Sequence, residues 1–138
     1  MNLAEALLAA DAGKIKKIAT EDYEVKRLSE IIGTPFVLHL RQIPMRRVTE
    51  IRENNVSLNS SGRVIGTDTY GILLNTLCDG IANDEFKQAD VLKHYGAATR
   101  KELFEILFNA GELAEISDRI IRLCGLSSES GQVDEIKN

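Results

Sequence analysis

Two histidines are the first residues to test for chemistry, because an imidazole is the usual general base near neutral pH. His39 lies between Leu38 and Leu40 in an alternating stretch, and His94 stands beside Tyr95 at the end of a helical pattern. The alternation predicts that His39 lies on the solvent face of a strand. At a helix end, His94 can meet the last carbonyls or solvent. We therefore expect neither histidine to be catalytic.

The acidic residues and glycines indicate no further chemistry. Acidic pairs such as Glu21-Asp22 and Asp84-Glu85 are adjacent in sequence, so their side chains diverge instead of sharing a proton or an ion. The segment SSGRVIG lacks the GxxxxGK[ST] arrangement that cradles phosphate, and no GxGxxG follows a predicted strand. The sequence predicts no catalytic, metal or cofactor site, so an enzyme is the least expected class.

The two cysteines, Cys78 and Cys124, each lie within an apolar helical pattern. Neither belongs to a CxxC motif or a Cys/His cluster. Free buried thiols are the expected state, because an unpaired cysteine packs as a small hydrophobic residue. A disulfide between the two is the alternative.

A concentration of positive charge is formed by Arg41, Arg46, Arg47, Arg52 and Arg63. It indicates either a solvated helix face or a surface for an acidic partner, for which Arg46 and Arg47 are the candidates. The net charge of -4 argues against a general nucleic-acid binder. A small regulatory or nucleic-acid-binding helical module that uses the Arg41 to Arg63 region remains the alternative function.

The elements that would position these residues begin with a short apolar helix over residues 1–13. Leu3, Leu7 and Leu8 share one side of it, and Gly13 stands where the helix would end. So short a helix is marginal in water by itself. It must dock, either on its own domain or on another subunit, which makes these three leucines candidate partner-binding residues.

A small antiparallel sheet is expected next. Alternation from Tyr23 to Arg27 predicts a half-exposed strand, and residues 28–32 a helical turn. Glycine, threonine and proline at 33–35 form a turn. The aromatic and β-branched run at 36–41 predicts a second strand.

Helical periodicity dominates the remainder of the chain. We expect a helix from Pro44 to Val56 and then a loop or loose hairpin over 57–66. A core helix capped by Thr67 or Asp68 follows, and its apolar face is formed by Ile72, Leu73, Leu77, Cys78 and Ile81. The last expected elements are a short helix ended by Gly96, a helix opened by a Thr99/Glu102 capping box, a break at 109–111 and a helix ended by Gly125. We predict an α+β fold, mainly α, with a small N-terminal antiparallel β element followed by a compact helical bundle. A single domain would span 14–126, with a flexible tail at 127–138.

The helix behind Thr99 carries more apolar side chains than one narrow face can hide: Leu103, Phe104, Ile106, Leu107 and Phe108. Deep burial within the bundle is one explanation. The other is a groove that accepts an amphipathic helix from a client or a neighbouring copy. In that case Leu103, Phe104, Leu107 and Phe108 would be partner-binding residues.

Nothing in the sequence predicts a membrane protein. The N-terminus has no basic segment ahead of its short apolar run, and no later run approaches the roughly 20 apolar residues of a membrane span. The hydrophobic fraction of 43% and the charged fraction of 28% are ordinary for a globular domain. We expect a cytoplasmic protein.

Three segments at their mutual spacing carry a resemblance: LAEALLAADAGK, EVKRLSEIIGTPFVL and LKHYGAATRKELFEILFNAGELAEI. In these the chain resembles the XkdN-like family of phage tail assembly chaperones, of the kind found in Gram-positive prophages and phage-like elements. Two positions depart from the family pattern. Arg100 stands where a proline would follow GAAT, and Asn109-Ala110-Gly111 replaces Leu-Pro-Gly.

The resemblance implies a function that the residues alone do not. Such chaperones bind the long tape measure protein and keep it soluble, and they are displaced when tail tube subunits assemble around it. The tail tube protein, a longer frameshifted form of the chain and further copies of the chain are the other partners we expect. The resemblance assigns no client-contacting residues.

Overall fold

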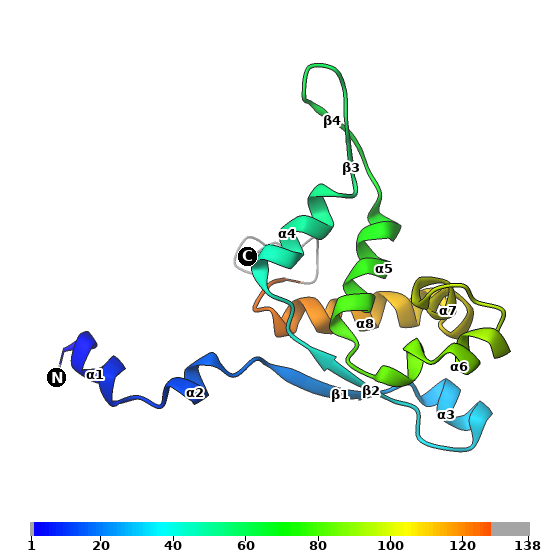
Figure 1. Ribbon diagram of the computed structural model, residues 1–138, viewed down its shortest axis with the longest axis horizontal. Coiled ribbons are helices and arrows are strands. Elements are labelled where there is room, and N and C mark those ends of the chain that lie inside the picture. Colours follow the sequence, from blue (N-terminus) through cyan, green and yellow to red (C-terminus); the bar gives the residue numbers. More distant parts are fainter. Residues whose placement is uncertain (1, 128–138) are drawn as a thin grey trace.

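The computed structural model describes residues 2–127, which form helices, one small sheet packed against them and a separate two-stranded hairpin (Figure 1). Its elements are α1 (Leu3–Ala9), α2 (Ala12–Lys16), β1 (Thr20–Glu24), α3 (Lys26–Ile32), β2 (Val37–Arg41), α4 (Met45–Glu53), β3 (Val56–Leu58), β4 (Val64–Thr67), α5 (Thr69–Gly80), the 3-10 helix η1 (Asp84–Lys87), α6 (Ala89–His94), α7 (Arg100–Leu107) and α8 (Ala110–Leu123). The predicted fold class, mainly α with a small antiparallel β part, is confirmed. Most of the predicted tail, 128–138, lies outside the described residues, whereas Ser127 is buried.

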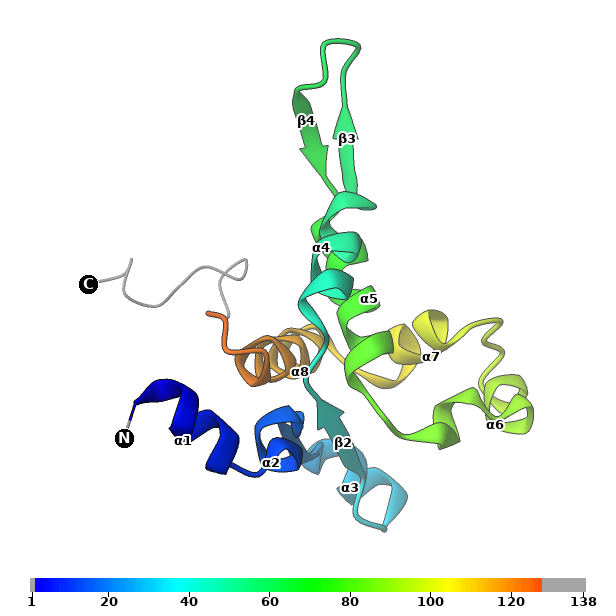
Figure 2. The same ribbon diagram turned by 60° about the vertical axis from the view of Figure 1, so that its left-hand side comes forward.

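Helices α1 and α2 form an arm that projects away from the rest of the molecule (Figures 1 and 2). Each begins with a side-chain cap: Asn2 accepts the Glu5 N–H at 2.8 Å, and Asp11 accepts the Gly13 N–H at 2.9 Å. The predicted helix end at Gly13 is wrong, because the Asp11 cap starts a second helix that includes this glycine. We call residues 2–17 the N-terminal arm.

The arm is anchored to the body at Ala19. Its N–H donates to the Gln42 side chain at 3.0 Å, and its carbonyl accepts the Gln42 N–H at 2.9 Å. These bonds continue the antiparallel pairing of β1 with β2, in which Thr20 lies opposite Arg41. The arm therefore has a fixed starting point on the sheet.

Strand β1 occupies residues 20–24, so the prediction of a strand from Tyr23 to Arg27 is wrong in its second half. Val25 is buried and its N–H bonds to the Phe36 carbonyl at 2.9 Å, after which α3 begins at Lys26. The buried Val25, which directly precedes α3, continues the alternation of buried and exposed residues beyond the end of β1. Strand β2 matches its prediction closely.

The outer edge of β2 is covered by the segment that follows α5 instead of a full third strand. Ile81 forms an isolated antiparallel bridge with Leu40, and the Ala82 N–H donates to the His39 carbonyl at 2.8 Å. Asn83 is buried, its Oδ1 accepts the His39 N–H at 2.8 Å, and its Nδ2 donates to the Val37 carbonyl at 3.1 Å. An asparagine amide offers both a donor and an acceptor, as an extended backbone does. The edge of β2 is thereby satisfied.

The hydrophobic core lies where β2, α5, α7 and α8 meet. Leu38 and Leu40 of β2 are buried, together with Leu77 of α5 and Ile120 of α8. Helices α5 and α8 approach closely at Gly80, where a Cβ would lie 2.5 Å from the Ile120 side chain. The four phenylalanines of the chain also pack together, with ring centroids 5.6 to 6.0 Å apart: Phe36, Phe86, Phe104 and Phe108.

Helix α4 is capped by Pro44 and ends at Glu53, short of the predicted Val56, which begins β3. The β3–β4 hairpin extends beyond the helices (Figure 1), with Val56 opposite Thr67. The expectation of a loose hairpin is confirmed. A left-handed Gly62, with φ of 81°, lies in its turn.

Two ion pairs join the last helix to the N-terminal half. Arg27 of α3 contacts Glu112 at 2.8 Å, and Arg119 contacts Glu21 of β1 at 2.5 Å. Arg119 also lies over the Tyr23 ring, 4.3 Å from its centroid. Hydrogen bonding to Arg27 lowers the pKa of Glu112, although partial burial opposes this change.

Candidate partner-binding surfaces

The two histidines lie on different elements. His39 is on the exposed face of β2, where its Nδ1 is 2.7 Å from Asp22 Oδ1, as expected for a solvent-facing strand residue. His94 ends α6 and meets the Tyr95 ring edge-on, with centroids 4.9 Å apart. Among residues 2–127, no group of three histidine, cysteine, aspartate or glutamate side chains is placed to hold a metal ion.

Both cysteines are free thiols within the described part of the chain. Burial raises the pKa of the Cys78 thiol. The Cys124 sulfur accepts the Ile43 N–H at 3.3 Å and donates to the Ile43 carbonyl at 3.6 Å. Each thiol therefore has a packing role in the body.

The five arginines do not form one continuous basic face. Arg47 pairs with Asp79 and, at 3.3 Å, with Glu50, while Arg41 donates to the Asp79 carbonyl at 2.9 Å. Arg63 lies in the hairpin turn, where its carbonyl accepts the Asn59 N–H. Arg46 is exposed on α4. Arg41 and Arg47 thus connect β2 and α4 to the end of α5.

The apolar excess of α7 is accounted for by burial. Leu103 and Phe104 have no exposed surface, and Leu107 and Phe108 are also buried. Only Ile106 of this group is exposed, at 52%. Of the two explanations for the α7 pattern, the structure shows the first, and a partner cannot reach the four buried side chains while α7 stays packed.

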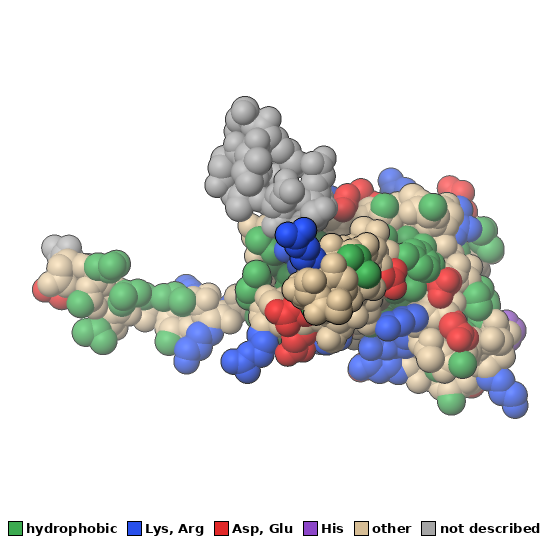
Figure 3. All heavy atoms as spheres, turned by 90° about the horizontal axis from the view of Figure 1, so that it is seen from above, with side chains coloured by type: hydrophobic (Ala, Val, Ile, Leu, Met, Phe, Trp, Pro, Cys, Tyr) green, Lys and Arg blue, Asp and Glu red, His purple; other side chains and the backbone are tan. Residues whose placement is uncertain are grey.

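The N-terminal arm, by contrast, presents its leucines to solvent. Leu3, Leu7 and Leu8 are 76%, 57% and 88% exposed, and no residue of α1 or α2 is buried. Figure 3 shows hydrophobic side chains gathered on the arm, clear of the body. Of the two arrangements expected for this helix, docking on its own domain is therefore not seen. Docking on another subunit is the other.

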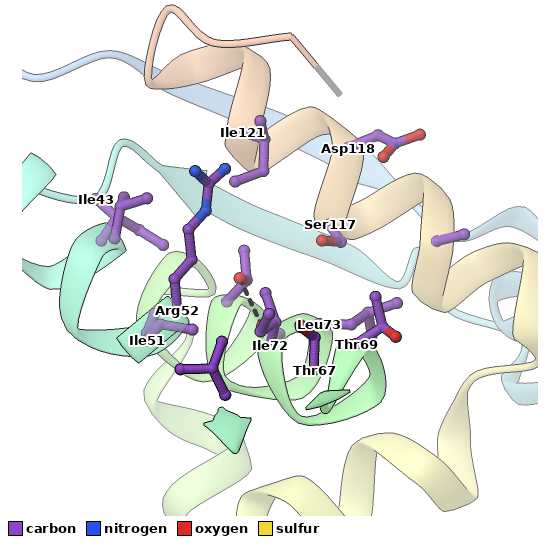
Figure 4. Close-up of a pocket in the computed structure, with 14 residues that line it drawn as sticks. Ile43, Ile51, Arg52, Thr67, Thr69, Ile72, Leu73, Ser117, Asp118 and Ile121 are labelled. Carbon is purple, nitrogen blue, oxygen red and sulfur yellow. Dashed lines mark hydrogen bonds between the residues drawn. The ribbon is translucent and has the colours of Figure 1, made fainter. Parts of the chain in front are cut away.

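A groove of about 470 Å³ opens between α4, α5, α8 and the base of the hairpin (Figure 4). Its apolar lining includes Ile43, Val48, Ile51, Ile72, Leu73 and Ile121. The Thr76 hydroxyl in the floor donates to the Ile72 carbonyl at 2.7 Å. Arg52 extends from α4 toward Ile121, and Asp118 points outward from α8. The groove is thus an apolar trough with one charged residue on each of two walls.

Sequence reasoning placed Ile72 and Leu73 in the core and did not find the groove. Both side chains are half-buried and line it, whereas the neighbouring Leu74 is buried in the core. The sequence feature that could have indicated the groove is the width of the apolar surface on α5. Consecutive apolar residues at 72–74 cannot all face one side of a helix.

Among the described residues, no helix is long and apolar enough to cross a bilayer. The family model described as "Phage XkdN-like tail assembly chaperone protein" matches residues 4–137. Among solved structures, the chain is similar to the protein YqbN, with a TM-score of 0.57 and 18% identity over 86% of this chain and 98% of that one. At this identity the likeness concerns the fold alone. No curated protein matches the chain.

Proposed function

Because this chain belongs to the family of phage XkdN-like tail assembly chaperones, we propose that it binds the tape measure protein of its tail. The bound chaperone keeps that protein soluble until tail tube subunits assemble around it. Its role in tail assembly follows from the family, which also points away from catalysis. The observation that best supports client binding is the open apolar groove between α4, α5 and α8.

The groove suits an amphipathic helix of the client. Helix-in-groove recognition places an apolar stripe of one helix into a trough lined by others. Ile72 and Ile121 are half-buried on facing walls, so a client helix could cover the surface they still expose. Apolar burial contributes about 25 cal/mol per Å², which favours moderate, reversible binding for a site of this size.

The proposed mechanism is stoichiometric binding, with no bond made or broken. A chaperone that binds exposed client helices lowers the concentration of aggregation-prone client by mass action. Several copies along one long client would act together. Tube assembly would release the chaperone because the interfaces between tube subunits and client are more extensive than the interface between chaperone and client. We propose that these steps take place in the host cell cytoplasm.

The test is co-expression of the chain with the tape measure protein of the same tail, followed by size-exclusion chromatography with light scattering. We expect a soluble complex that contains several chaperone copies. Ile121→Glu should weaken the complex, because it places a charge in the groove, whereas Ile31→Glu, on the exposed face of α3, should not. Insoluble client beside unbound chaperone would contradict the proposal.

A further inference from the structure

The N-terminal arm carries an apolar face that no other element of the described residues covers. Leu3 and Leu7 lie one helical turn apart on α1, and Leu8 widens the apolar surface toward Glu5, which precedes it by three residues. A helix of seven residues is marginal in water without a surface to pack on. The arm therefore has the properties of a docking element whose receptor lies outside its own α1–α2 unit.

The root of the arm directs it outward. Ala19 is held by two hydrogen bonds to Gln42, and the preceding residues continue away from the body (Figures 1 and 3). For α1 to reach the groove of its own chain, the arm would have to bend back toward the body. A neighbouring copy can meet the arm where it already points.

We propose that α1 of one copy docks into the α4–α5–α8 groove of a second copy, so that the chain self-associates through arm-to-groove contacts. The groove exposes apolar surface on Ile72, Leu73 and Ile121, and the arm exposes apolar surface on its leucines. A groove of about 470 Å³ lies in the range of roughly 300–1,000 Å³ that encloses small ligands, which leaves room for a few leucine side chains.

Both surfaces also carry charged residues at their edges. The arm carries Glu5 on α1 and Lys14 and Lys16 on α2, and the groove carries Arg52 on the α4 wall and Asp118 on the α8 wall. Arg52 and Asp118 each already have an interaction within the chain, so a docked arm would be held mainly by its leucines. Such rim charges fix orientation more than they add affinity.

Arm-to-groove docking uses the same groove as the proposed client site, so arm and client helix compete for it. Self-association would then protect the groove in copies without a client, and a client helix would replace the arm. Only this competition rests on the proposed function. Self-association is a property of the chain alone and is tested without any client.

The first experiment measures the mass of the full chain by size-exclusion chromatography with light scattering over a concentration series. We expect the mass to rise above the 15.3 kDa of one chain as concentration increases. The arm variant Leu7→Glu/Leu8→Glu and the groove variant Ile72→Glu should each stay monomeric. Ile31→Glu, an exposed isoleucine on neither surface, should associate like the unmodified chain. Circular dichroism would confirm that each variant is folded, and Ile121→Glu replaces Ile72→Glu if that variant is not.

Mixing the two defective variants gives a second, more specific test. The arm variant keeps an intact groove and the groove variant keeps an intact arm, so together they should form a one-to-one complex although neither associates alone. No complex on mixing would overturn the proposal. A wild-type chain that stays monomeric at every concentration would also overturn it, and concentration-independent protection of the arm from hydrogen exchange would then identify docking within one chain.

Discussion

At the residue scale, Gly80 decides how closely α5 and α8 can pack. A Cβ there would lie 2.5 to 2.7 Å from three atoms of Ile120, and this isoleucine is fully buried. The helix would gain up to about 1 kcal/mol in propensity from an alanine. The clash is more costly, because a buried side chain has no space into which it can move.

We therefore predict that Gly80→Ala lowers the free energy of unfolding by about 1–3 kcal/mol, as overpacked cores do. Urea denaturation followed by circular dichroism measures this change. Gly66→Ala is the matched control, since its Cβ would meet nothing within 4 Å. The control should change stability by less than about 1 kcal/mol. Equal effects of the two substitutions would show that the α5–α8 contact tolerates a methyl group.

Glu112 links stability to pH. Its pKa is lower in the folded protein than in the unfolded chain, chiefly through the hydrogen bond from Arg27. Its stabilising effect is therefore complete above the unfolded value, near 4.5, and is lost as pH falls through the lower folded value. We predict that Glu112→Gln reduces the loss of stability between about pH 5 and pH 3.

Thermal unfolding over this pH range measures the effect. Glu30→Gln, on the exposed side of α3, provides the comparison and should leave the pH dependence of stability unchanged. If Glu112→Gln and the unmodified chain lose stability in parallel on acidification, the ion pair with Arg27 does not control this part of the curve.

At the scale of elements, helix starts were the most predictable features. The Thr99 hydroxyl accepts the Glu102 N–H at 3.2 Å and Asp68 accepts the Gly71 N–H at 2.8 Å, as their positions in the sequence predict. The predicted capping box is only half formed, because the Glu102 carboxylate accepts the Ala98 N–H instead of the Thr99 N–H. Asn109 was assigned only to a break, yet it forms a full capping box with Glu112. The Asn109/Glu112 spacing is typical of a capping box, but Gly111 between them led to the prediction of a break.

That capping box leads to a prediction for α8. Asn109→Ala should destabilise the protein by about 1 kcal/mol, because it leaves N–H groups at the helix start without their acceptor. Chemical denaturation measures the change. Asn109→Ser, which keeps a side-chain oxygen for capping, should retain most of the stability. Equal losses in the two variants would assign the effect to something other than the cap.

Other elements could not be predicted because they depend on contacts distant in sequence. Val25 looks like a strand residue, but the Phe36 carbonyl and the core fix it as the entry to α3. The groove arises from how α4, α5 and α8 are placed relative to one another. Periodicity within one helix counts its apolar residues but does not say which of them a neighbouring helix leaves uncovered.

At the scale of the whole molecule, the arm and the body are energetically separate. No described residue of the arm is buried, so the arm adds little to the stability of the body. We predict that deleting residues 2–17 changes the free energy of unfolding by no more than about 0.5 kcal/mol. Thermal and urea unfolding of the truncated chain at low concentration check this. A loss of several kcal/mol would mean that the arm packs on its own body.

The ion pair between Arg27 and Glu112 has a consequence for how the protein is made. These residues are 85 positions apart, and α8 also packs on β2, so the core around the β2 leucines closes only after α8 has been synthesised. At translation rates of about 5–20 residues per second, that interval is roughly 4 to 17 s. During it, Leu38 and Leu40 have no completed core to enter. A nascent tail chaperone thus briefly exposes apolar side chains, as does the client that it is proposed to protect.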